Sequence, residues 1–303
     1  MAHGGGNRAI IAALGANLGI AVTKFVAYLL TSSSSMLAEA VHSLADSGNQ
    51  LLLLVGGKRA QKAADDEHPF GYGRERYVFA FIVSIVLFSL GGLFALYEAW
   101  HKWAEPHPIE SWKWVPVVVL VAAIGLEGFS FRTAIHESNL TRGKQSWVSF
   151  VRTAKAPELP VVLLEDFGAL IGLVLALGGV GMTLATEDGR WDAVGTAGIG
   201  VLLVLIAIVL AFETKSLLLG ESATKSDVAA IRAALVGEGV SSVIHLRTMH
   251  LGPEEVLVAA KIEVPAAITA ADVAAAIDAA EKRVREAVPI ARVIYLEPDL
   301  RRA

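Results

Sequence analysis

The sequence predicts a polytopic α-helical membrane protein, with six transmembrane helices followed by a small cytoplasmic α+β domain. Its mean hydropathy is +0.55, and 54% of its 303 residues are apolar while 18% are charged. This balance is too apolar for an ordinary soluble chain of that length. Six stretches approach the roughly 20 apolar residues that a helix needs to cross a bilayer. After residue 220 the charges return and the apolar runs shorten. We therefore expect a membrane domain at 1–220 and a cytoplasmic domain at 221–303.

The six predicted spans begin with residues 8–30, whose apolar core is long. Because no small-residue cleavage pattern follows it, we interpret this stretch as a retained helix rather than a signal peptide. The other five spans are expected at residues 36–57, 77–100, 114–135, 160–184 and 194–212. The second span differs from the rest because several charged residues interrupt it.

Loop charges predict the orientation of these spans. The loop after the second span and the loop after the fourth are rich in basic residues: Lys58, Arg59, Lys62, Arg74 and Arg76 in one, Arg142, Lys144, Arg152 and Lys155 in the other. The loops on the opposite side are poor in them, and "TSSSS" at 31–35 has none. By the positive-inside rule, both termini face the cytoplasm.

The region after residue 220 alternates helix and strand signals. An amphipathic helix is expected at 226–238, then two strands at 240–251 and 254–264 joined by the turn "GPE". A helix from Ala270 to Ala287 follows, with Thr269 as its N-cap, and a third strand lies at 291–299. Within the second strand, alternate residues share one face: Val256, Val258, Ala260, Ile262 and Val264. This order predicts an α+β sandwich of about 80 residues.

Composition also excludes some partners and ligands. The net charge of −4 provides no strongly basic face to neutralise phosphates, so we expect no nucleic-acid partner. The chain contains no cysteine, so any metal site must use nitrogen and oxygen donors. Membrane lipid remains the expected surrounding of the apolar spans.

The second span carries a polar face. Glu39, His42, Asp46 and Asn49 are spaced three, four and three residues apart, so they lie along one side of a helix. An ionised aspartate near the bilayer centre costs about 2.5–3.5 kcal/mol on insertion scales. Such residues usually face a bundle interior or a cavity with a partner, so we interpret this face as a functional site rather than a packing feature.

A histidine and an aspartate four residues apart place an imidazole nitrogen beside a carboxylate oxygen, which suits a divalent cation. Zinc takes four ligands, so one helix supplies only part of the shell. The fifth span offers Glu165 and Asp166. Adjacent helical residues differ by about 100°, so we expect one of them to face His42 and Asp46. The other would contact water, a backbone group or a lysine such as Lys24, and Glu127 in the fourth span is left open.

Several motifs together resemble one known family. The pair His42-x-x-x-Asp46, the loop "DDEHPFGYGRER" at 65–76, the tail motif "HLRT" and the six helices resemble the cation diffusion facilitator family of zinc transporters. They are most similar to the branch that includes a mitochondrial zinc transporter and its bacterial relatives. The resemblance implies a homodimer that exports divalent cations, usually zinc, in exchange for protons, without a further cofactor. It also implies a ferredoxin-like αββαβ dimerisation domain, and we expect a bacterial inner membrane.

The resemblance also implies site residues. His42 and Asp46 match the half of the transport site on the second helix. On the fifth helix the family has a histidine or aspartate four residues before an aspartate; Asp166 matches the latter, whereas Val162 occupies the former position. Glu165, Asn49 or a water would complete the shell. Zn²⁺ is the expected metal, with Mn²⁺ and Fe²⁺ as alternatives.

Two further metal positions of the family match only in part. In the loop, Asp65 and His68 match, but Tyr72 replaces a second histidine, and a phenol with a pKa near 10 is a poor zinc ligand at neutral pH. In the tail, His245 matches and Glu297 is a substitute acidic ligand. Lys261 and Leu296 stand where histidines are expected. We expect weak sites at best, and favour reading His245 and His250 as ordinary strand residues.

Proton coupling follows from ligand chemistry, because histidine must be neutral and aspartate ionised to bind a metal. Metal and protons would therefore compete for His42, Asp46 and Asp166. Two other classes stay open. An intramembrane metal-dependent hydrolase would need a general base beyond the ligands, and the chain has no H-E-x-x-H motif. A metal-sensing receptor would use the tail as its output without moving ions.

Overall fold

A computed structural model describes the backbone of residues 3–300 and the side chains of residues 17–300. The chain forms two compact units. One holds the helices up to Gly56 and then Val78–Thr214; the other combines the loop Gly57–Tyr77 with the chain from Lys215 onward. The two-domain boundary at residue 220 stays a prediction, and the loop after the second helix groups with the tail rather than with the helices.

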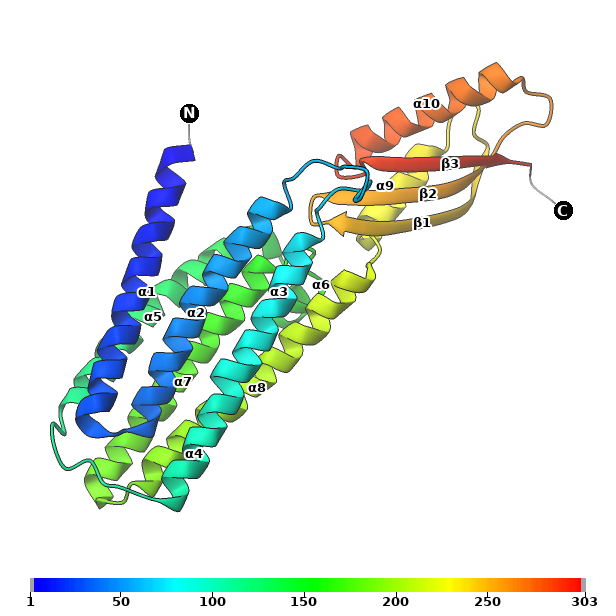
Figure 1. Ribbon diagram of the computed structural model, residues 1–303. Coiled ribbons are helices and arrows are strands. Elements are labelled where there is room, and N and C mark those ends of the chain that lie inside the picture. The colour runs from blue at the N-terminus through cyan, green and yellow to red at the C-terminus, as the bar shows by residue number, and fades with distance from the viewer. Residues whose placement is uncertain (1–2, 301–303) are drawn as a thin grey trace. The chain divides into compact units, whose positions relative to one another are not determined.

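Helices make up the first unit, and Figure 1 shows several long ones running side by side. They are α1 (His3–Thr31), α2 (Ser34–Arg59), α3 (Glu75–Val86), the π-helix η1 (Leu87–Leu93), α4 (Phe94–Ala104), α5 (Val115–Arg142), α6 (Trp147–Thr153), α7 (Glu158–Thr186) and α8 (Arg190–Leu219). The segments α3, η1 and α4 follow one another without a break, so they form one helical segment. A long helix thus covers each of the six predicted spans.

Within the residues whose side chains the structure describes, four helical segments are long and apolar enough to cross a membrane: Glu75–Ala104, Val115–Arg142, Glu158–Thr186 and Arg190–Leu219. In α1 the apolar stretch with described side chains, Asn17–Thr31, is shorter. The polar face of α2 lowers its hydropathy. A membrane domain of apolar helices is therefore confirmed, while six crossings remain a prediction.

The core of the first unit is aliphatic, and α7 packs against α5, which also packs against α1. The π-helix η1 lies where two helices approach closely. A Cβ added to Gly92 would lie 2.5 Å from Cγ2 of Val204 in α8. Any larger residue at Gly92 would therefore force α8 away from η1.

A buried carboxylate in the first turn of α8 caps the start of α2. Asp192 is fully buried and accepts hydrogen bonds from Ser33 Oγ at 3.0 Å, Ser34 N at 2.7 Å and Ser35 N at 3.3 Å. The first N–H groups of a helix have no partner within the helix and carry partial positive charge. Asp192 supplies the missing acceptors, so α8 fixes the end of the helix that carries His42 and Asp46.

Replacing Asp192 with alanine is expected to lower the free energy of unfolding by about 1–3 kcal/mol, because it leaves buried donors unpaired. Thermal unfolding of the purified protein in detergent measures this loss. Asp278→Ala, on the exposed face of α10 (Ala270–Ala287), is the control and should change little. Equal stability of the two variants would contradict the role given to Asp192.

The second unit is an α+β domain. Its elements are α9 (Lys225–Leu235), β1 (Ser242–Gly252), β2 (Glu255–Glu263), α10 (Ala270–Ala287) and β3 (Val293–Asp299). The predicted N-cap is confirmed: Thr269 Oγ1 accepts from Asp272 N, and the Asp272 side chain accepts from Thr269 N. This reciprocal capping box fixes the start of α10.

The sheet has the order β1-β2-β3, and β1 pairs with β2 antiparallel while β2 pairs with β3 parallel. Figure 1 shows the three strands with α9 and α10, and these two helices pack against each other. Alternate β2 residues, Val256, Val258, Ala260 and Ile262, are at most 4% exposed. They join Ile231 of α9 and Val284 of α10 in one core, so the predicted apolar face of the second strand is confirmed.

Candidate metal centre

The polar face of α2 lies inside the helical unit. Glu39, His42 and Asn49 are buried, and the Asp46 side chain is 15% exposed. Helical spacing brings His42 Nε2 to 3.5 Å from Asp46 Oδ2. This separation is too long for a good hydrogen bond. The imidazole and the carboxylate therefore lie next to each other without forming a hydrogen bond.

Glu165 and Asp166, which are adjacent in α7, turn to different neighbours. Glu165 Oε1 accepts from Asn49 Nδ2 at 2.7 Å, whereas Asp166 Oδ2 accepts from Ser130 Oγ of α5 at 2.9 Å. The divergence follows from the step of about 100° between adjacent helical residues. Lys24, expected as one possible partner of this pair, instead donates to Glu39 Oε2 at 2.9 Å and to Ser43 Oγ at 2.8 Å.

Asp46 and Asp166 face the same small cavity, which has a volume of about 20 Å³. Its lining comes from α1, α2, α5 and α7: Asn17, Ile20, Ser43, Asp46, Gln50, Glu127, Ser130 and Asp166. A space of roughly 10–15 Å³ is enough for one water-sized species. Carboxylates from α2, α5 and α7 thus surround a space the size of a small ion. His42 and Glu165 are not among the lining residues.

Several buried polar atoms on the polar face of α2 lack hydrogen bonds within the described residues. They are both ring nitrogens of His42, Oδ1 of Asp46 and Oδ1 of Asn49. Leaving such groups unpaired costs free energy, and a cation would satisfy the nitrogen and carboxylate donors. Among residues whose side chains are described, no three His, Asp or Glu side chains are close enough to hold a metal ion as they stand. A metal bound by His42, Asp46 and Asp166 together would therefore require these side chains to move closer together.

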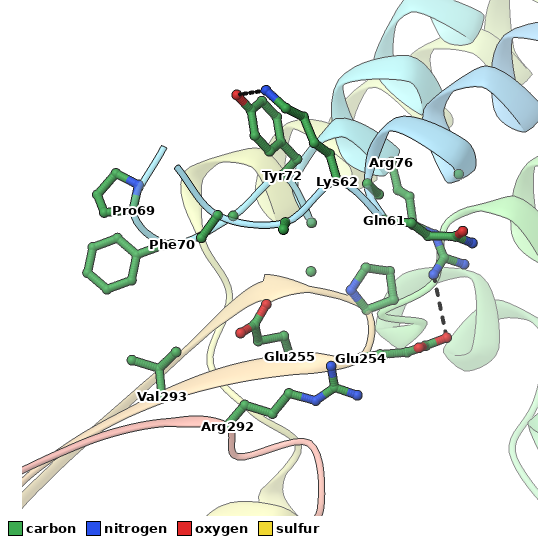
Figure 2. A pocket seen from close by; sticks show the side chains of 18 residues that line it. Gln61, Lys62, Pro69, Phe70, Tyr72, Arg76, Glu254, Glu255, Arg292 and Val293 are labelled. Atoms are coloured by element: carbon green, nitrogen blue, oxygen red, sulfur yellow. Dashed lines mark hydrogen bonds and ion pairs between the residues drawn. The ribbon is translucent and has the colours of Figure 1, made fainter. Parts of the chain in front are cut away.

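In the loop between α2 and α3, a lysine binds Asp65, one of the predicted site residues. Lys62 Nζ lies 2.8 Å from Asp65 Oδ2 and 2.6 Å from the Tyr72 hydroxyl, and Figure 2 shows the latter contact. Tyr72 also donates to Asp65 Oδ2 at 2.7 Å. His68 Nδ1 lies 3.6 Å from Asp65 Oδ1. The Lys62 ammonium thus provides a positive charge beside the carboxylate where a metal was considered.

The loop cluster is expected to stay ordered between about pH 5 and about pH 9. Hydrogen bonds from Lys62 and Tyr72 hold the pKa of Asp65 well below its usual range, so this contribution to stability is lost only as the pH falls below that range. The same contacts raise the pKa of Lys62 above its usual range, so its contribution is lost only at strongly alkaline pH. Limited proteolysis of the loop across this range should give a constant rate.

The variant Lys62→Met should speed that cleavage across the whole range, because Asp65 loses its cation. Lys144→Met, in the exposed loop after α5, is the matched control and should leave the cleavage rate unchanged. A cleavage rate that rises steeply near neutral pH in the parent protein would contradict this assignment.

The same loop packs on the β1–β2 turn and forms with it a pocket of about 490 Å³ within the second unit. Arg76 Nη1 lies 3.8 Å from Glu254 Oε1, as Figure 2 shows. A Cβ added to Gly73 would lie 2.8 Å from the carbonyl oxygen of Leu251. This close approach means that only glycine fits at position 73 without moving the loop.

In the tail, His245, Lys261 and Glu297 lie in one row across the three strands. Lys261 Nζ lies 3.0 Å from Glu297 Oε1 and 2.9 Å from Asp299 Oδ2, which raises the pKa of Lys261. His245 Nε2 accepts from Arg247 Nε at 2.9 Å. Lys261 therefore lies between the two predicted tail ligands, His245 and Glu297. The Nε2 atom of His245 already accepts a hydrogen bond from Arg247.

Two family models together match most of the chain. The cation efflux transmembrane domain matches residues 10–219, and the cytoplasmic domain of cation efflux proteins matches residues 223–299. The chain belongs to the cation efflux family, the cation diffusion facilitators. The resemblance inferred from His42, Asp46 and the loop motif is thereby confirmed.

Curated relatives of this cation efflux protein come from several kingdoms. It is 30% identical over 243 residues to the human "Proton-coupled zinc antiporter SLC30A9, mitochondrial", covering 79% of this chain and 43% of that protein. It is 28% identical to "Metal tolerance protein C4" of Arabidopsis thaliana, and the match covers 81% of this chain and 54% of that protein. It is 27% identical to "Magnetosome protein MamB" of Magnetospira sp., and the match covers 78% of this chain and 76% of that protein. The chain thus spans less than half the length of the human relative.

Two residues of the candidate site carried weaker sequence signals. Glu127 and Ser130 of α5 both line the cavity beside Asp166. They are three residues apart, so they lie on one helical face. In the sequence, this spacing of two polar residues within an apolar span was the signal that could have placed them at the site. Helix α5 thus lines the candidate centre together with α2 and α7.

Proposed function

We propose that this chain is a secondary transporter that exports Zn²⁺ from the cytoplasm in exchange for protons. Membership of the cation efflux family and the human relative's name, a proton-coupled zinc antiporter, support the proposal. The observation that carries it is the meeting of Asp46 and Asp166, from α2 and α7, at one cavity inside the helical unit. Acidic groups buried among apolar helices mark ion pathways.

We propose His42, Asp46 and Asp166 as ligands of the transported ion. Glu127 is the fourth candidate because it lines the same cavity. Asn49 donates a hydrogen bond to Glu165 at 2.7 Å. This contact joins α7 to α2 and leaves both side chains less available as metal ligands. Nitrogen and carboxylate donors suit Zn²⁺, and they also admit Mn²⁺ and Fe²⁺.

The proposed exchange uses the same atoms for both ions. Metal binding requires a neutral imidazole and ionised carboxylates, so the arriving ion displaces protons from His42, Asp46 and Asp166. After the helices open toward the other side of the membrane, returning protons take these positions and release the metal. The exchange needs no resident cofactor and no bond cleavage.

The membrane arrangement belongs to the same proposal. We propose that α1 and α2 cross the membrane beside the four apolar segments, with both termini cytoplasmic and the protein in a bacterial inner membrane. The αββαβ order of the tail supports a ferredoxin-like domain, and the match to the cytoplasmic domain family supports a homodimer formed through it.

A flux assay in proteoliposomes tests the function. With Zn²⁺ outside and a pH-sensitive dye inside, the proposal predicts metal uptake together with proton movement in the opposite direction. Parallel titrations with Mn²⁺ and Fe²⁺ rank the metals. A metal-sensing receptor would change the conformation of its tail without flux, and an intramembrane hydrolase would give neither flux nor proton exchange; either result would overturn the proposal.

A further inference from the structure

A large apolar groove lies on the helical unit and shares no lining residue with the cavity at Asp46 and Asp166. Its volume is about 680 Å³, within the roughly 300–1,000 Å³ of ligand sites. The walls come from α5, α6, α7 and α8. Of the thirteen described residues that line it, only Arg152 and Glu213 are charged. The groove therefore suits a hydrocarbon chain and has charge at its rim.

The short helix α6 forms the wall next to that rim. Its Phe150 is 4% exposed and packs with Ala134 of α5 and Leu163 of α7, which fixes α6 to the bundle. The neighbouring Val148, in contrast, is 69% exposed, and Phe212 across the groove is 65% exposed. Apolar side chains thus remain open on a helix that is itself firmly anchored.

The rim carries an excess of positive charge. Arg142 lies with its guanidinium carbon 4.1 Å from the centre of the Trp147 ring, and its hydrogen bonds go to the side chain of Asn139 and the carbonyl of Gln145. These partners are uncharged, so they do not balance its charge. Arg152 Nε lies 3.8 Å from Glu213 Oε1, and the Arg152 side chain is 71% exposed. Glu213 therefore pairs with Arg152, while the contacts given for Arg142 are all with uncharged groups.

We propose that this groove binds an anionic phospholipid, with one acyl chain along the apolar walls and the phosphate held by Arg142 and Arg152. Guanidinium groups bind phosphate in a bidentate geometry. Basic pockets between membrane helices and tryptophan at the membrane interface are typical of lipid headgroup sites. A second copy of this chain would bring the same arginines to the rim, whereas the lipid supplies both the apolar chain and the negative charge.

Lipid retention by the purified full chain tests this site. Native mass spectrometry after addition of phosphatidylglycerol should show bound lipid. A parallel sample with phosphatidylcholine should show several-fold less bound lipid. The double variant R142A/R152A should lose phosphatidylglycerol several-fold. Glu213→Gln should raise its retention, because the variant removes the carboxylate that pairs with Arg152 and opposes the phosphate. This opposite direction separates charge recognition from simple misfolding.

Matched controls complete the test. The double variant R232A/R285A removes two basic residues from α9 and α10 and should retain lipid like the parent. Inorganic phosphate should not compete, since it lacks the acyl chain. Because the chain has no cysteine, Val148→Cys gives a unique thiol. Efficient disulfide formation between two copies through that thiol, or undiminished phosphatidylglycerol binding by R142A/R152A, would overturn the proposal.

Discussion

Replacing Asp46 or Asp166 with asparagine is expected to abolish zinc-for-proton exchange in proteoliposomes, with a loss of at least about 100-fold. Even residues that only support metal ligands cost roughly 10–100-fold when they are replaced, and these two carboxylates face the central cavity directly. Asparagine keeps the size of the side chain but has neither the negative charge nor a titratable proton. The initial rate of metal uptake and the rate of proton movement should therefore fall together.

The matched control for both variants is Asp278→Asn, an exposed aspartate on α10, which should transport at the parental rate. Glu127→Gln and Glu165→Gln then rank the fourth position: the larger loss should come from Glu127, which lines the cavity. If Asp46→Asn or Asp166→Asn transported at the parental rate, the replaced carboxylate would not be a ligand of the transported ion.

Replacing Lys24 with methionine is expected to lower the free energy of unfolding by about 3–5 kcal/mol, because breaking a buried ion pair leaves a buried charge. Lys24 Nζ lies 2.9 Å from Glu39 Oε2, and the two side chains are 1% and 0% exposed. Loss of the ammonium also removes the hydrogen bond to Ser43. Thermal unfolding in detergent, followed by tryptophan fluorescence, measures the change.

A second substitution separates the unpaired charge from lost packing. The double variant K24M/E39M should recover most of the stability, because apolar pairs replace buried ion pairs at little cost. Lys113→Met is the control: Lys113 Nζ lies 3.6 Å from Glu187 Oε1 at the surface, where an ion pair contributes only about 0–1 kcal/mol. If K24M and K113M unfold at the same temperature, the Lys24–Glu39 pair is not the stabilising contact inferred here.

Local sequence patterns predicted the elements whose causes are local. The N-cap at Thr269 acts on Asp272, three residues away, and the alternation in β2 depends only on the period of a strand. Both features are present where they were expected. In the same way, the spacing of His42 and Asp46 placed them on one helical face before any packing was known.

Features set by packing between distant segments could not be predicted in this way. Asp192 meets Ser33 across 159 residues, and Lys24 finds Glu39 on another helix; neither contact has a sequence period. The short helix α6 was also not expected. Helices of this length are marginal by themselves, so the burial of Phe150 decides that α6 forms. Lys62 had the local spacing to meet Asp65 but was counted only as a loop charge.

A structure of the full chain saturated with Zn²⁺, with the metal located by anomalous scattering, tests the proposed transport site most directly. The proposal predicts an anomalous peak between α2 and α7, about 2.0–2.2 Å from ligand atoms of His42, Asp46 and Asp166. An anomalous peak confined to the loop or the tail, with the cavity at Asp46 and Asp166 empty in the metal-saturated protein, would contradict it.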